Sequence, residues 1–160
     1  MKNLNLSILF ILSFLFSYSQ GQLPDVELNT LDGKKVKLIE QLNEEGPTII
    51  SLWATWCVPC LKELDAISEV YEDWQSETNV KLIAISIDDS RTVKRVKPLI
   101  NGKGWDYEIL LDVNTDLKRA LNATNIPLTI IVKNHKIVYE HMSYVPGAED
   151  ELYDKIKNLK

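Results

Sequence analysis

The chain contains few of the residues that usually bind metal ions. Among its 160 residues there are two cysteines and two histidines, whereas a structural zinc site takes four such ligands, commonly arranged as two closely spaced pairs. Cys57 and Cys60 form one such pair, and no second cysteine pair or suitably spaced histidine pair accompanies it. We therefore expect no metal site and no bound cofactor.

A structural disulfide is also a poor explanation for the two cysteines. A bridge between Cys57 and Cys60 would enclose only two intervening residues, so it would remove little entropy from the unfolded chain. Hydrophobic residues make up 45% of the sequence, which is enough for one core without a cross-link. Redox chemistry is therefore favoured over a structural role for this pair.

Positive charge is scarce as well. The chain has 18 Lys and Arg against 23 Asp and Glu, a net charge of −5 at pH 7. Proteins that bind nucleic acids usually carry a basic patch or arm, and the sequence has neither. Lys62 and the basic residues between Arg91 and Lys97 are expected on solvated helix faces.

Phenylalanine is absent from most of the chain, because all three phenylalanines lie in the apolar stretch Leu4–Phe16. This stretch follows Lys2 and precedes the small residues of Ser17–Ser19, which predicts a signal peptide over residues 1–19. The stretch is short for a hydrocarbon core of ~30 Å, so a retained N-terminal membrane anchor is the less favoured alternative. Residues 20–160 are expected to form one domain.

The order of apolar segments predicts an α/β fold with a mixed central sheet and helices on both faces. Thr48–Ala54 and Val80–Ile87 are almost continuously apolar, as buried strands are. A helix over Cys57–Glu77 joins them, which predicts a parallel pair. The other expected elements are a hairpin of Leu23–Asn29 and Lys35–Leu38, helices over Ile39–Glu45, Ser90–Ile100 and Asn114–Leu121, a strand over Tyr107–Leu111, a hairpin of Leu128–Val132 and Lys136–Met142, and a helix over Gly147–Leu159.

The two cysteines lie where the first buried strand passes into the long helix. At a helix N-terminus, unpaired N–H groups and the helix dipole favour a thiolate. Cys57, at the helix start, is expected to be the exposed nucleophile that attacks a disulfide and forms a mixed disulfide. Cys60 lies one turn further in, is expected to be more shielded, and would then attack the Cys57 sulfur.

Glu63 is a further candidate for catalysis. It follows Cys60 by three residues and precedes the apolar Ile67 by four, so it points towards the buried side of the helix. A buried carboxylate is costly unless it is protonated, hydrated or hydrogen-bonded, and such a group can exchange a proton with Cys60. From the residues alone, a second interpretation is equally good: Glu63 could be an ordinary first-turn glutamate stabilised by the helix dipole.

The chain resembles the exported thioredoxin-like proteins of the TlpA/ResA type, a branch of the redoxin (AhpC/TSA-like) group. The resemblance covers essentially all of the chain after residue 20. It rests on Leu23–Leu28 with Asp32-Gly33-Lys34, on the motif Leu52–Cys60, and on Ile126-Pro127, where the family has a cis-proline. It implies a thioredoxin fold with an N-terminal β-hairpin and an inserted helix and strand over Asp88–Leu111.

The resemblance also implies roles for individual residues. Glu63 stands where the exported branch carries a carboxylate that acts with the second cysteine, while Ser51 replaces the buried aspartate of cytoplasmic thioredoxins. Leu128 replaces a threonine that is commoner after the cis-proline. The backbone before Pro127 is expected to pair with an extended substrate. The expected substrate-contacting residues are Trp56, Val58, Pro59, Ile126 and Pro127.

The remaining aromatic and histidine side chains are expected to be structural. Trp53, Trp74 and Trp105 are assigned to the core, in contrast to Trp56 at the rim of the site. His135 falls on a turn and His141 in an edge strand, and neither has a partner with metal-ligand spacing. We expect both histidines to have no part in the chemistry.

The resemblance implies a monomeric reductase of protein disulfides in the bacterial periplasm, with apocytochromes c among its substrates. A membrane thiol–disulfide transporter would supply electrons. Val58-Pro59 resembles the reducing branch, whereas strong oxidants of this fold usually carry histidine in that dipeptide. The alternatives are a disulfide oxidant or isomerase of the same fold, a binding module with a vestigial dithiol, and a peroxiredoxin-type thiol peroxidase. The peroxidase is disfavoured because its Pro-x-x-x-Thr-x-x-Cys loop is absent: Thr55 precedes Cys57 by two residues.

Overall fold

A seven-stranded mixed sheet forms the centre of the fold in a computed structural model, which describes residues 21–159. The strand order is β2-β1-β5-β4-β3-β6-β7. The strands are β1 (Glu27–Thr30), β2 (Lys35–Lys37), β3 (Thr48–Trp53), β4 (Lys81–Ser86), β5 (Glu108–Leu111), β6 (Leu128–Lys133) and β7 (Lys136–Met142). The helices are α1 (Val58–Thr78), α2 (Val96–Lys103), α3 (Asp116–Ala120) and α4 (Ala148–Lys157), with 3₁₀ turns η1 (Leu38–Gln41) and η2 (Val93–Arg95).

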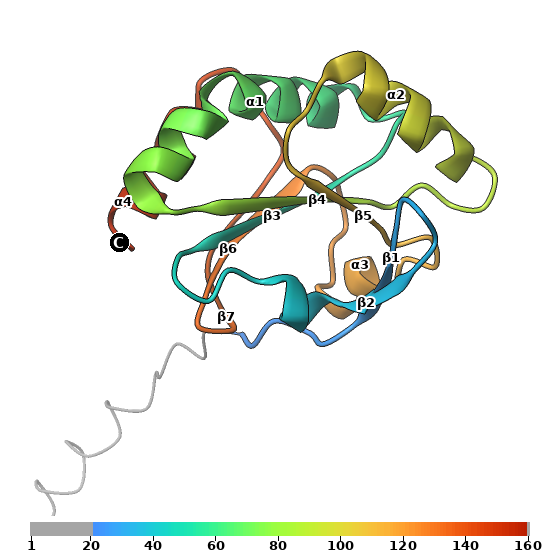
Figure 1. The fold of residues 1–160 in the computed structure, drawn as a ribbon, viewed down its shortest axis with the longest axis horizontal. Helices are drawn as coiled ribbons and strands as arrows, with labels where there is room; N and C mark the ends of the chain where they lie inside the picture. Colours follow the sequence, from blue (N-terminus) through green and yellow to red (C-terminus); the bar gives the residue numbers. More distant parts are fainter. Residues whose placement is uncertain (1–20, 160) are drawn as a thin grey trace, which may run out of the picture.

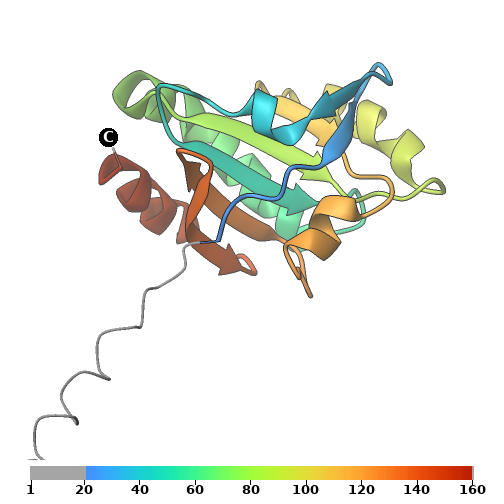
Figure 2. The same cartoon turned by 90° about the horizontal axis from the view of Figure 1, so that it is seen from below.

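Helices cover both faces of this sheet, as predicted. Helices α1 and α2 lie on one face, whereas α3 and η1 lie on the other (Figures 1 and 2). Helix α4 packs beside α1, where Tyr153 stacks on Trp74 with ring centroids 5.3 Å apart. The predicted signal peptide over residues 1–19 lies outside the described residues. Within residues 21–159, no helix has the length and apolar character needed to cross a membrane.

The two central strands pair in parallel, which confirms the prediction from their apolar runs. All six residues of β3 are buried, and so are five of the six in β4. The register matches Thr48 with Lys81 and Trp53 with Ser86. Because α1 runs back from the end of β3 to the start of β4, the C-terminal ends of both strands meet at the same edge, beside the cysteines.

Both predicted hairpins are present, at opposite edges of the sheet. Strands β1 and β2 pair antiparallel, and so do β6 and β7. The start of the described chain is bound to the second hairpin: Gln22 bridges to Lys136, and the Leu23 amide donates to the carbonyl of His135. This attachment lies beside the β6–β7 turn.

Helices in the second half of the chain begin later than predicted. The expected helix over Ser90–Ile100 is instead a turn followed by η2 and α2, and the Asp89 carboxylate accepts the amide protons of Arg91 and Thr92 in that turn. Such side-chain bonds satisfy the free amides at the first turn of a helical segment. The Asp112 carboxylate likewise receives the amides of Asp116 and Lys118, so α3 starts at Asp116 rather than at 114.

The segment after the first hairpin also differs from expectation. A helix was predicted over Ile39–Glu45, but the structure has only the 3₁₀ turn η1. The chain leaves this turn because the Thr48 hydroxyl accepts the Asn43 amide at 2.8 Å, and the Asn43 side chain bonds the backbone carbonyl of Asn79. These contacts satisfy backbone groups outside a helix.

Two tyrosines in contact with each other, Tyr71 of α1 and Tyr107 just before β5, are expected to make the stability of the fold sensitive to alkaline pH. Burial raises the pKa of Tyr107, and Asp65 and Glu63 raise it further. Burial also raises the pKa of Tyr71, whose ring meets that of Tyr107 edge-on. Since the folded state holds these phenolic protons more tightly than the unfolded state, their stabilising contribution is intact below about pH 10 and is lost as the pH rises beyond it.

We therefore expect the free energy of unfolding to fall as the pH rises above about 10, and to fall less steeply in Tyr107→Phe. Urea unfolding followed by circular dichroism measures both slopes. The variant also loses the hydroxyl bond to the Leu64 carbonyl, which costs about 1 kcal/mol. Equal slopes for the two proteins would show that Tyr107 does not contribute.

Candidate active site

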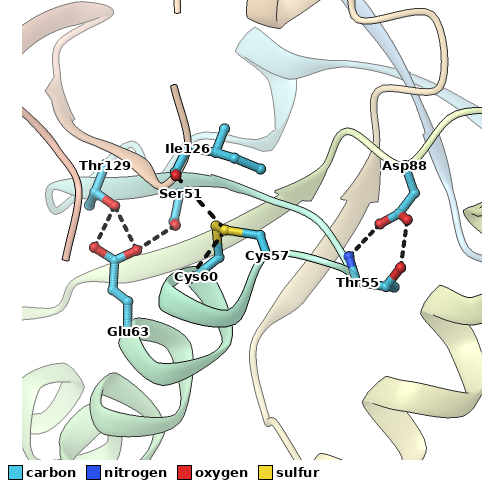
Figure 3. Close-up of a disulfide and its surroundings, with 8 residues drawn as sticks. All are labelled: Ser51, Thr55, Cys57, Cys60, Glu63, Asp88, Ile126 and Thr129. Carbon is cyan, nitrogen blue, oxygen red and sulfur yellow. Dashed lines mark hydrogen bonds between the residues drawn. A yellow bond between two sulfur atoms is a disulfide. The ribbon is translucent and has the colours of Figure 1, made fainter. Parts of the chain in front are cut away.

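The two cysteines form a disulfide at the N-terminus of α1. Cys57 is the N-cap residue of the helix, with extended backbone angles (φ −94°, ψ 94°), and its sulfur accepts the Cys60 amide at 3.3 Å. The Cα atoms of the two cysteines are 5.3 Å apart. Pro59 occupies the first turn, where a missing amide proton breaks no helix bond. This is the predicted placement of a dithiol at a helix start (Figure 3).

Cys57 is less exposed than predicted. Its exposed fraction is 5%, against 0% for Cys60, so the order of exposure is as expected but Cys57 itself is buried. The reason is the neighbouring loop: the Ile126 carbonyl oxygen lies 3.8 Å from the Cys57 sulfur. The Ile126-Pro127 peptide bond is cis, which confirms that prediction.

A groove of about 470 Å³ opens beside Cys57. Trp56 and Val58 stand at its rim and are 57% and 61% exposed. Of the five residues predicted to contact substrate, the structure brings four together here, while Pro127 does not line the groove. The lining residues are Trp56, Cys57, Val58, Pro59, Lys118, Thr124, Asn125 and Ile126.

The loop that carries the cysteines is fixed by Asp88, a residue to which the sequence analysis gave no role in the site. Asp88 is fully buried. Its Oδ2 accepts the Thr55 amide and the Ser86 hydroxyl, both at 2.8 Å, and its Oδ1 accepts the Thr55 hydroxyl at 2.6 Å. The signal in the sequence that could have identified Asp88 was its position directly after the apolar run Val80–Ile87. That run pairs with the strand that leads to the cysteines.

Glu63 is buried, as its spacing from Ile67 predicted. It is 2% exposed. Its Oε2 accepts the Ser51 hydroxyl at 3.0 Å, and the Thr129 hydroxyl lies 2.9 and 3.0 Å from its two oxygens. In Figure 3 the Ser51 hydroxyl lies between this carboxylate and the two sulfurs. The carboxylate is therefore a bound, buried group and not a solvated first-turn glutamate.

His141 contacts Glu63, which was not predicted. Its Nε2 lies 3.2 Å from Glu63 Oε1, and its side chain is 18% exposed. In β7 the exposed residues Glu140 and Met142 flank the partly buried His141. The signal available in the sequence was the two-residue period of a strand, which places His141 on the same face as Tyr139 and opposite Glu140 and Met142.

The comparisons with known proteins agree with this geometry. The sequence model of the AhpC/TSA family matches residues 20–141. Thiol-disulfide oxidoreductase ResA of Bacillus anthracis is 28% identical over 116 residues, which are 72% of this chain and 64% of that protein. Sporulation thiol-disulfide oxidoreductase A of Bacillus subtilis is 25% identical over 126 residues, 78% of this chain and 73% of the relative. The chain thus spans about 64% of the length of the ResA proteins it matches.

Solved structures show the same fold. A thioredoxin-like protein of Porphyromonas gingivalis, described as uncharacterized, is 52% identical, with a TM-score of 0.76 over 86% of this chain and 90% of that one. A putative thiol:disulfide interchange protein DsbE from Chlorobium tepidum is 17% identical, with a TM-score of 0.76 over 88% and 96% of the two chains. The second likeness shows the fold alone. The predicted thioredoxin fold is confirmed.

Proposed function

Because the chain belongs to the AhpC/TSA family, we propose that it is a thiol–disulfide oxidoreductase that reduces protein disulfides through Cys57 and Cys60. The observation that carries this proposal is the Cys57–Cys60 disulfide at the start of α1, which faces a groove beside the Ile126 carbonyl. Relatives named thiol-disulfide oxidoreductases support it. The dithiol itself carries two electrons, so the reaction needs no cofactor.

The reaction begins from the reduced protein. The Cys57 thiolate attacks a substrate disulfide, one substrate sulfur leaves as a thiolate, and a mixed disulfide forms. The Cys60 amide, 3.3 Å from the Cys57 sulfur, and the other free N–H groups at the helix start stabilise that thiolate. Cys60 then attacks the Cys57 sulfur, which releases the second substrate thiolate and forms the disulfide seen here.

Glu63 is proposed to take the proton of the Cys60 thiol before this second attack. The thiol must lose its proton to become a nucleophile, and Cys60 is 0% exposed, so solvent is a poor acceptor. The Glu63 carboxylate lies three residues along the same helix and receives the Ser51 hydroxyl. When a donor later reduces the disulfide, the same carboxyl group returns the proton to Cys60.

The groove is suited to an extended polypeptide. Trp56 and Val58 give its rim a large apolar surface that is exposed in the free protein, and such surfaces mark sites of interaction. We assign substrate contact to these two residues, to Pro59 and to the backbone at Ile126-Pro127. The carbonyl of Ile126 beside the sulfur would guide the substrate strand to the reacting atoms.

The direction and setting of the reaction follow from the resemblance. We propose reduction in the bacterial periplasm by a monomer whose signal peptide, residues 1–19, is cleaved. A membrane thiol–disulfide transporter would supply the electrons, and apocytochromes c are among the candidate substrates. Val58-Pro59 between the cysteines supports the reducing direction.

The reduction potential of the Cys57–Cys60 couple tests this direction. We expect a value near or below about −250 mV at pH 7, on the thioredoxin side of the scale. Equilibration in dithiothreitol redox buffers, followed by the fluorescence of Trp53 and Trp56, gives the value. A potential near about −120 mV would identify an oxidant instead.

A further inference from the structure

Three polar side chains form a row across the sheet beneath Glu63. The register pairs Ser51 of β3 with Thr129 of β6, and Thr129 with His141 of β7. Each of the three contacts the Glu63 carboxylate, at distances between 2.9 and 3.2 Å. They therefore share the sheet face that α1 covers, and the row runs from the centre of the sheet to its edge.

His141 differs chemically from the other two members of this row. Ser51 and Thr129 are fully buried and offer hydroxyl groups, each of which has one O–H proton to donate. His141 offers a ring N–H, and its contact is the only one between Glu63 and a basic side chain within 4 Å in residues 21–159.

The second ring nitrogen indicates which way the hydrogen bond runs. Nδ1 of His141 is buried and has no hydrogen-bond partner in the described part of the chain. A proton on Nδ1 would be an unsatisfied buried donor, which is costly. The ring therefore carries a proton on Nε2 and donates it to Glu63 Oε1, which fixes the orientation of the carboxyl group.

The groups near the pair are mostly acidic or aromatic. Acidic residues outnumber basic ones around it. The pKa of Tyr144 is raised first by burial, then by its hydrogen bond to Glu149, and also by the charges of Glu63 and Glu69. The His141 ring centroid lies 5.8 Å from that of Tyr139, whose hydroxyl bonds Glu151. The titratable and charged groups that interact with Glu63, with His141 or with the tyrosines next to them are Asp65, Glu69, Tyr107, Tyr139, Tyr144, Glu149, Glu151 and Lys155.

We propose that His141 is a positioning residue for the second step: its Nε2–H holds the Glu63 carboxylate in the orientation in which it accepts the Cys60 proton. The proposal deepens the proposed function and rests on it. In the step, the Cys60 S–H proton passes to Glu63, a bond forms between the sulfurs of Cys60 and Cys57, and the bond from Cys57 to the substrate sulfur breaks. The departing thiolate takes a proton from solvent.

The disulfide reagent 5,5′-dithiobis(2-nitrobenzoate) separates the two attacks. Reduced protein releases one coloured thiolate when Cys57 attacks, at a rate that depends on reagent concentration. It releases a second coloured thiolate when Cys60 attacks, at a rate that does not depend on reagent concentration. In His141→Leu we expect an unchanged first phase and a second phase about tenfold slower at pH 7, because the carboxylate that accepts the Cys60 proton loses the hydrogen bond that orients it.

Matched variants separate this role from a merely structural one. His141→Gln keeps an N–H donor at a similar reach and should stay within about twofold of wild type. His135→Asn alters the other histidine, an exposed turn residue with φ 64°, and should leave both phases unchanged. In a Glu63→Gln background, His141→Leu should have no further effect, because residues that act through one another are not additive.

Two results would overturn the inference: a wild-type second phase in a folded His141→Leu, or equal slowing in the Gln and Leu variants. Thermal unfolding of each variant shows whether it is folded. A wild-type protein that releases only one thiolate would instead contradict the dithiol mechanism itself. The failure of this inference is thus distinguishable from the failure of the proposed function.

Discussion

Cys57→Ser is expected to abolish disulfide reduction, with a rate loss of at least about 10³-fold. The attacking group is a thiolate, and a serine hydroxyl stays protonated at neutral pH and is a weak nucleophile. Serine is close in size to cysteine, so the loop held by Asp88 should keep its conformation. The reduction of insulin disulfides, followed by turbidity, measures the loss.

Cys60→Ser is the matched control for that prediction. It keeps the Cys57 thiolate but removes the second nucleophile, so the reaction should stop at the mixed disulfide after one equivalent of thiol is released. Mass spectrometry of the trapped species would locate the adduct on Cys57. An adduct on Cys60 in the Cys57→Ser variant, formed at the wild-type rate, would mean that the order of attack is reversed.

Asp88→Ala is expected to lower the free energy of unfolding by about 3 kcal/mol, because it leaves buried donors of Thr55 and Ser86 without an acceptor. For a domain of this size, that corresponds to a fall in Tm of about 10 °C. Differential scanning calorimetry measures the change. The same substitution releases the loop before Cys57, so the alkylation rate of reduced Cys57 by iodoacetamide should change in the folded variant.

Asp112→Ala provides a control with similar burial. Asp112 is 2% exposed and accepts the amides of Asp116 and Lys118 at the start of α3. Its removal should also destabilise the fold, because two backbone amides lose their acceptor. Since Thr55 stays bound to Asp88 in this variant, Cys57 alkylation should change less than in Asp88→Ala. If both variants altered alkylation equally, the effect would report general loosening and not the anchoring of Thr55.

The central part of the fold was predictable because its signals are local. The apolar runs that became β3 and β4, the helical spacing of α1 and the position of Glu63 relative to Ile67 each depend on a few neighbouring residues. The cis bond before Pro127 was predicted by family resemblance and is present. These features needed no knowledge of which strands lie side by side.

The remaining features depend on contacts between distant segments. The burial of Cys57 follows from Ile126, which is 69 residues away in the sequence, and the contact of His141 with Glu63 spans 78 residues. Both require the register of β6 and β7 against β3. The starts of α2 and α3 were missed for another reason: Asp89 and Asp112 bind backbone amides where each helical segment begins, and hydrophobic periodicity carries no information on such bonds.

The attachment of Gln22 to Lys136 sets the direction in which the reactive end of the domain faces. Lys136 begins β7 beside the β6–β7 turn and lies level with the first residues of β3. Cys57, in contrast, comes after the last residues of β3. Six residues of extended strand separate these two ends, about 20 Å. A partner or surface that holds the protein by its N-terminal side would therefore leave the dithiol pointing outward, free to meet a large substrate from the opposite side.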